Sequence, residues 1–123
     1  MSITSTFNTQ LINFYNELEN LNIDKKLIKN SKTKIILLKK ANSKILIELF
    51  IQHIYIYKSF ITSKNIQIFD NINENIEDKE NNKIYMLFNV LKNNWDIYNN
   101  ETKENIWLYL NVLIKLCDNY INK

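Results

Sequence analysis

Residues 101–122 read ETKENIWLYLNVLIKLCDNYIN and carry the strongest periodic signal in this chain of 123 residues. Apolar residues recur there at steps of three and four, the spacing that gathers side chains on one face of an α-helix. Acidic residues stand near its start, where negative charge stabilises a helix, and Asn99 or Asn100 can cap its first turn. The inward face is expected to hold Ile106, Trp107, Leu110, Leu113, Ile114, Cys117, Tyr120 and Ile121.

The same spacing predicts four further helices upstream. Asp24 can cap the second of them, and Asn42 or Ser43 can cap the third. The predicted helices cover about residues 5–22, 25–40, 43–60 and 83–94. Their expected inward residues are Phe7, Leu11, Phe14, Leu18, Leu21, Leu27, Ile28, Ser31, Ile35, Leu38, Ile45, Leu46, Leu49, Phe50, His53, Ile56, Tyr57, Phe60, Ile84, Leu87, Phe88, Leu91 and Trp95.

The third segment has a wide apolar face, which predicts a central position. Its run Ile54-Tyr55-Ile56-Tyr57 could also form a strand, but the length and cap signals of the segment favour a helix. Its apolar window is interrupted by charged residues and is shorter than the roughly 20 apolar residues of a membrane span. We expect no membrane span, and residues 1–7 do not have the pattern of a signal peptide.

The helical pattern lapses over residues 62–82. Ile66, Ile68 and Phe69 are expected to pin a loop or short helix to the core. Residues 70–82 are acidic and rich in asparagine, which predicts a mobile loop. The fold predicted for residues 1–123 is all-α, a compact single-domain bundle of about five helices.

The composition excludes several classes of site. Glycine is absent, which excludes glycine-rich phosphate loops, nucleophile elbows and dinucleotide-binding fingerprints. His53 and Cys117 are the only histidine and cysteine, so the chain can form neither a four-ligand zinc site nor an internal disulfide. We expect no metal and no cofactor. All 16 basic residues are lysine, a bias typical of an AT-rich genome.

No combination of residues predicts an active site. His53 would need a partner such as Glu48 or Tyr57, and Glu48 lies on another side of the expected helix. Cys117 lies in an apolar stripe without a neighbouring base, so burial in the core is expected. The acidic pairs at helical spacing fall in a polar loop and at an exposed helix start, and they are Glu74/Glu77, Glu77/Glu80 and Glu101/Glu104. The chain is therefore predicted not to be an enzyme.

Positive charge is concentrated in the second helix. Residues 24–44 hold eight lysines and one aspartate, a net charge of +7, while the rest holds eight lysines and twelve acidic residues, a net charge of −4. One lysine stripe on this helix consists of Lys25, Lys29, Lys32, Lys39 and Lys40. It could attract nucleic acid or another polyanion without sequence preference. It could equally be a solvated surface, or it could be covered by acidic residues 70–80.

Several large residues fall outside the inward faces, and some are expected to be exposed. They are Tyr15, Ile36, Leu37, Tyr55, Tyr98, Leu108 and Tyr109. Exposed apolar and tyrosine surface is typical of a contact with another protein or with a second copy. Imprecise assignment of the helix faces is the alternative.

Residues 95–113 read WDIYNNETKENIWLYLNVL and resemble a recurring signature of small proteins of giant (nucleocytoplasmic large DNA) viruses. In that signature a tryptophan, a short turn and a lysine precede Ile-Trp-x-Tyr-Leu-x-x-Leu. Residues 7–18 and 39–42 are also similar, although this chain lacks the proline and glycine of such relatives. The motif can describe a helical hairpin clamped by Trp95 and Trp107 and anchored by Ile106 and Leu110. The resemblance implies fold and origin only, because no activity is known for the group.

These features favour a non-enzymatic viral interaction protein, an adaptor or virion component that binds a viral or host protein in the host cytoplasm or the virion and is not secreted. Homo-oligomerisation is possible. Nucleic-acid binding through the lysine stripe is the alternative. A further alternative is an apoptosis modulator, since Asn94-Trp95 is similar to the groove motif of Bcl-2-like proteins, with Asp96-Ile97 in place of Gly-Arg.

Overall fold

The computed structural model describes residues 2–75 and 83–123, and every regular element in these residues is helical. They form α1 (Ile3–Asn20), α2 (Lys25–Ala41), α3 (Ile45–His53), the 3₁₀ helix η1 (Tyr55–Tyr57), α4 (Lys58–Thr62), α5 (Gln67–Asn75), α6 (Lys83–Asn94) and α7 (Asn100–Ile121). The predicted all-α class is confirmed. The expected number of about five helices is too low, because the described residues contain seven α-helices.

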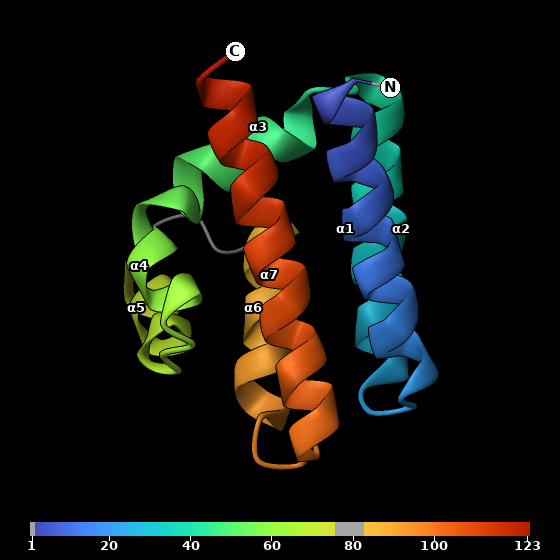
Figure 1. The fold of residues 1–123 in the computed structure, drawn as a ribbon. Helices are drawn as coiled ribbons and strands as arrows, with labels where there is room; N and C mark the ends of the chain where they lie inside the picture. Colours follow the sequence, from blue (N-terminus) through green and yellow to red (C-terminus); the bar gives the residue numbers. More distant parts are fainter. Residues whose placement is uncertain (1, 76–82) are drawn as a thin grey trace.

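The helices pack around one apolar core. In Figure 1, α1 and α2 lie side by side as a hairpin, α6 is seen behind α7, and α4 and α5 lie on the other side of α7 from α1 and α2. Helix α7 packs against α1, while α6 packs against α2 and α5. Helix α3 crosses one end of the bundle, close to both chain termini, instead of running through its centre as predicted. The result is a bundle in which α7 has its inward face on the core and its other face at the front of the molecule.

The α1–α2 hairpin follows the predicted periodicity with two corrections. Tyr15, expected outside the inward face, is fully buried, and its hydroxyl lies 2.8 Å from that of Ser31. Leu27, expected inward, is 46% exposed. Asp24 stands at the N-cap of α2 as predicted, but its side chain makes no cap hydrogen bond and accepts one from the Asn94 amide instead, at 2.6 Å. The hairpin is thus tied to α6 by a polar contact that no local pattern indicated.

The third predicted helix is broken in the structure. Helix α3 ends at His53, and the segment Tyr55–Thr62 continues at an angle of 47°. Ile54 at the break is fully buried, whereas Ile56, expected inward, is 71% exposed. The bend lets the chain turn its apolar residues onto the core from two directions. No single described helix is long and apolar enough to cross a membrane, and this bent pair meets the criteria of length and composition only when its two halves are joined.

Helix α5 occupies part of the region where the periodicity lapses. The side chain of Asn65 accepts a hydrogen bond from the Gln67 amide at 3.0 Å at the start of the helix. Ile68 and Phe69 are buried as expected, while Ile66 is 55% exposed. Residues 70–75 are helical, so the loop predicted for 70–82 is wrong over these six positions. The rest of that predicted loop, residues 76–82, lies outside the described residues.

Three aromatic rings join α5, α6 and α7. The indoles of Trp95 and Trp107 meet edge to face with centroids 5.4 Å apart, and the ring of Phe69 lies 5.1 Å and 5.8 Å from them. Ile106 and Leu110, the other two residues of the expected clamp, are buried beside them. At the turn, the side chain of Asn99 caps α7 by accepting a hydrogen bond from the Thr102 amide at 2.8 Å. This arrangement fixes the rotation of α7, and hence which of its residues face outward.

Candidate protein-interaction surface on α7

One row of residues along α7 points away from the core. Leu108 is 63% exposed and Val112 is 37% exposed, although both are apolar. With their polar neighbours they form a row spaced by four and three residues in alternation, which keeps the row on one side of a helix. We call this row the outer seam of α7, and it consists of the exposed residues Glu101, Asn105, Leu108, Val112, Lys115 and Asn119.

A hollow of about 260 Å³ opens beside the centre of the outer seam. Its lining from α7 is Asn105, Leu108, Tyr109 and Val112, and α1 adds Gln10 and Glu17. The four α7 residues stand at positions i, i+3, i+4 and i+7. In packed helices, four residues at this spacing surround the hole that receives one side chain of a partner helix. The hollow therefore has the geometry of an unfilled knobs-into-holes site.

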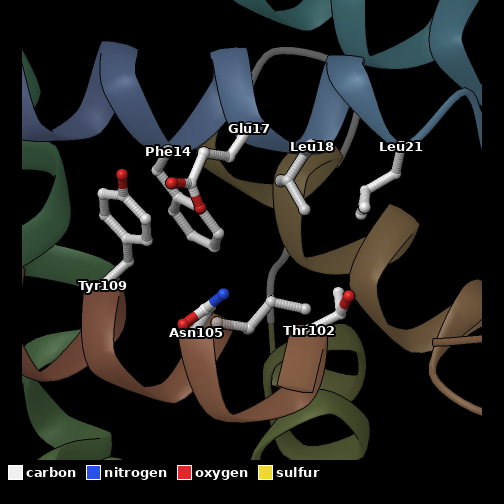
Figure 2. Close-up of a pocket in the computed structure, with 8 residues that line it drawn as sticks. Phe14, Glu17, Leu18, Leu21, Thr102, Asn105 and Tyr109 are labelled. Carbon is white, nitrogen blue, oxygen red and sulfur yellow. The ribbon is translucent and has the colours of Figure 1, made fainter. Parts of the chain in front are cut away.

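A second, narrower hollow of about 50 Å³ continues between α1 and α7. Figure 2 shows side chains of the two helices pointing toward one another across it, with Leu18 and Leu21 on one side and Thr102 and Asn105 on the other. The rings of Phe14 and Tyr109 stack with centroids 5.0 Å apart and planes at 6°. The stacked pair gives the α1–α7 groove a rigid wall.

The groove is apolar inside and acidic at its edge. Burial raises the pKa of Tyr109, and the nearby carboxylate of Glu17 raises it further. The phenol is therefore protonated at neutral pH and can donate a hydrogen bond. A partner side chain that enters the larger hollow meets carbon atoms of Leu108 and Val112, the amides of Gln10 and Asn105, the Tyr109 phenol and the Glu17 carboxylate.

The lysine stripe of α2 is partly occupied. Lys32 donates hydrogen bonds to Glu19, at 2.8 Å, and to Asn16, at 3.1 Å, both on α1. This bond from Lys32 is the main reason why the pKa of Glu19 is lowered. The remaining stripe residues are exposed and form no ion pair with a described residue, and they are Lys25, Lys29, Lys39 and Lys40.

The alternative that acidic residues 70–80 cover the stripe can be followed only at Asp70, the one acidic residue of this range whose side chain the structure describes. Asp70 pairs with Lys92 of α6, with 3.0 Å between its carboxylate and the ammonium nitrogen. The side chain of Glu74 and residues 76–80 lie outside the described part of the chain. The exposed lysines of α2 are thus available to a polyanion over the parts that the structure describes.

The candidate catalytic residues are not brought together. His53 is half-buried, and its imidazole forms no hydrogen bond with a described residue, while the carboxylate of Glu48 lies 3.5 Å from the Tyr120 hydroxyl. Cys117 is fully buried, and burial raises the pKa of its thiol to about 12. Glu104 pairs with Lys64 at 2.7 Å. The described residues contain no cluster of three or more metal-ligating side chains, and the side chains of the predicted pairs Glu74/Glu77 and Glu77/Glu80 lie outside them.

Sequence reasoning missed one polar cluster. Asp118 of α7 accepts hydrogen bonds from the Tyr55 hydroxyl and from Lys58, the latter at 2.9 and 3.0 Å. These bonds lower the pKa of Asp118 and raise the pKa of Tyr55 and of Lys58. The three residues join α7 to the segment after the bend, so the cluster holds the bend in place. Tyr55 at the rim of an apolar face was the only signal of it in the sequence.

Comparisons with known proteins assign no family. No protein-family model matches the chain, and neither a curated protein nor a solved structure matches it significantly. The residues similar to the Bcl-2-like motif have local roles in this structure. Asn94 is buried and donates to Asp24, and Trp95 packs on Trp107.

Proposed function

We propose that this chain is a non-enzymatic interaction protein that docks an α-helix of a partner molecule along the outer seam of α7. The observation that carries the proposal is the open four-residue hole at Leu108, because such a hole is complementary to a side chain of a second helix. An amphipathic helix with one large apolar residue at its centre fits this surface, as in other helix-in-groove contacts. The similarity of residues 95–113 to giant-virus proteins supports a viral source as part of this proposal.

The absence of an assembled reaction centre among the described residues supports the non-enzymatic part of the proposal. The thiol of Cys117 is buried and protonated, and His53 has no carboxylate or hydroxyl partner there. General acid–base or nucleophilic chemistry needs such groups within hydrogen-bond reach of one another. The outer seam of α7, with its exposed Leu108 and Val112, is therefore the surface to which we assign the function.

A photo-cross-linking experiment tests the proposal. Val112→Cys places a single reactive thiol on the outer seam, and it can carry a benzophenone probe because native Cys117 is buried. We expect this probe to link to the apolar face of a helix in a partner protein in extracts of the source cell. A probe at Asn93→Cys, on the exposed side of α6, is the control and should not form that product.

A pair of leucine variants makes the same test specific. Leu108→Asn should abolish the cross-link, whereas Leu37→Asn should leave it intact, because Leu37 is similarly exposed but lies on α2. Equal products from both probes, or a product insensitive to Leu108→Asn, would contradict the proposal.

Polyanion binding through α2 is the second candidate, and it is favoured by the four exposed lysines of the stripe. Binding to duplex and single-stranded DNA should weaken steeply with salt, by a log–log slope of about 0.9 or 0.7 per phosphate contact. Replacing Lys25, Lys29, Lys39 and Lys40 by glutamine should flatten that slope. Lys32→Gln, which removes a lysine bonded to Glu19, is the matched control and should change it least. Unchanged binding after the fourfold replacement rules this candidate out.

A further inference from the structure

We infer that the helix that occupies the outer seam is α7 of a second copy of this chain, packed antiparallel across a two-fold axis at Leu108. This inference rests on the proposed function and names the partner of the same surface. Three features of the seam carry it: the order of its charges, the position of its most exposed apolar residue and the shape of the hole beside that residue.

The charges of the seam are arranged symmetrically about Leu108. Glu101 and Lys115 each stand seven residues from it, one on either side, and both are exposed. In an antiparallel pair centred on Leu108, Glu101 of each copy lies opposite Lys115 of the other copy. A parallel pair would instead place Glu101 against Glu101 and Lys115 against Lys115. Charge complementarity therefore favours the antiparallel arrangement.

Both charged residues are available for this contact. Glu104, the neighbouring acid, pairs with Lys64, but neither Glu101 nor Lys115 forms an ion pair with a described residue. Across the two-fold axis the contact forms twice, once from each copy. Two copies of one modest contact therefore fix both the direction and the register of the helices.

The apolar centre has the matching shape. Leu108 is the most exposed apolar residue of the seam, and the hole beside it is open. With the axis at Leu108, the two leucines lie next to one another, and each faces the hole lined by Asn105, Leu108, Tyr109 and Val112 of the other copy. The contact is self-complementary, because each copy supplies one knob and one hole. In Figure 1 no other helix among residues 2–75 and 83–123 lies in front of α7, so a second copy can approach it.

The expected dimer is weak. One helix face with two apolar residues is a small contact, of the class that forms transient rather than stable complexes. Sedimentation equilibrium of the full chain from 5 to 500 µM, in about 0.15 M salt, measures the dissociation constant of the dimer. The inference predicts a reversible monomer–dimer equilibrium without higher assemblies, because an isologous contact closes on itself.

Charge reversal tests the register. Glu101→Lys and Lys115→Glu each place like charges opposite one another, and each should weaken the dimer at least about fivefold. The double variant Glu101→Lys/Lys115→Glu exchanges the signs and should recover the wild-type constant within about threefold. An equimolar mixture of the two single variants should form a heterodimer tighter than either homodimer, since every facing pair then has opposite charges. Lys26→Glu, on α2, is the control and should change the constant less than twofold.

The outcomes separate this inference from the proposed function. A wild-type chain that is monomeric at 500 µM, or a double variant as weak as the single variants, overturns the pairing with a second copy. If the chain is monomeric but the Val112→Cys probe still links to a helix of another protein, the docking function stands and the inferred partner is wrong. If the probe also captures nothing, both fail.

Discussion

The two faces of α7 use the same residue types for opposite purposes. Leu110 is fully buried and Leu108, two positions before it, is 63% exposed. Trp107 on the inner face is 4% exposed and meets Trp95 and Phe69. The difference teaches that the position of an apolar residue around the helix, rather than its type, separates residues that hold the fold from residues free to contact a partner. An apolar residue out of phase with the core is the informative one.

The largest expected difference between the faces is in stability. Trp107→Ala removes a buried indole from the aromatic cluster and should lower the free energy of unfolding by about 3–5 kcal/mol. Leu108→Ala, the adjacent residue on the outer face, should change it by less than about 0.5 kcal/mol. Urea unfolding at 5 µM, where the chain is expected to be monomeric, measures both. Similar losses in the two variants would show that the assignment of the faces is wrong.

Thiol reactivity should separate the faces next. Because Cys117 is buried and its pKa is raised to about 12, its alkylation at pH 8 requires local opening. We expect it to react at least about a hundredfold more slowly than the thiol of Leu108→Cys. Mass spectrometry of samples quenched over time gives both rates. Comparable rates would contradict the packing of the inner face.

Asp118, which lies between the inner and outer faces of α7, should have a smaller effect on stability, and this effect should depend on pH. The Tyr55 hydroxyl and Lys58 hold the pKa of Asp118 below the value of about 3.9 expected in the unfolded chain. The stabilisation is therefore present above about pH 4 and is lost as the pH falls through the folded pKa. Asp118→Asn should lower the urea midpoint at pH 7 and 5 by less than Trp107→Ala does, and the difference should shrink toward pH 3. A difference that does not depend on pH would remove the ionic explanation.

The smallest effect is expected at the second apolar residue of the seam. Val112→Ala removes methyl groups that are partly exposed but gains helix propensity, so the free energy of unfolding at 5 µM should change by less than about 0.5 kcal/mol. The same variant should weaken association. A large loss of stability would mean that Val112 belongs to the core.

Much of the fold follows from local spacing. The predicted segment 83–94 coincides with α6, the predicted end of the last helix lies one residue from the end of α7, and Asn99 caps α7 as expected. The clamp of Trp95 and Trp107 also forms, with Trp95 directly after the end of α6 and Trp107 on the inward face of α7. Strong amphipathic segments with cap residues are the elements for which local spacing is sufficient.

The errors arise where distant contacts override local spacing. The bend at Ile54 occurs without glycine or proline, and it is held by Asp118, 64 positions away in the sequence. Tyr15 is buried with its hydroxyl hydrogen-bonded to the hydroxyl of Ser31 on another helix. The position of Ser31 on the apolar face of α2 was the sequence feature that could have predicted a buried polar partner such as Tyr15.

The candidate site was predicted only in part. Leu108 belongs to the group of large residues outside the inward faces, some of which were expected to be exposed, and it is one of those that are. The hole beside Leu108 could not be predicted from the sequence. Gln10 and Glu17 of α1 line one of its sides, and only the packing of α1 on α7 brings them there. The equal spacing of Glu101 and Lys115 from Leu108 can be read from the sequence, but it indicates a pairing surface only because the structure shows both residues exposed.

The decisive measurement is a dilution series of the isotope-labelled chain followed by nuclear magnetic resonance, because it reports every backbone amide and both indoles at once. Between 500 and 20 µM, the account predicts shifts that change with concentration for the amides of the outer seam, centred on Leu108, while the indole signals of Trp95 and Trp107 stay constant. Changes centred on another helix, or indole signals that move together with those of the seam, would contradict it.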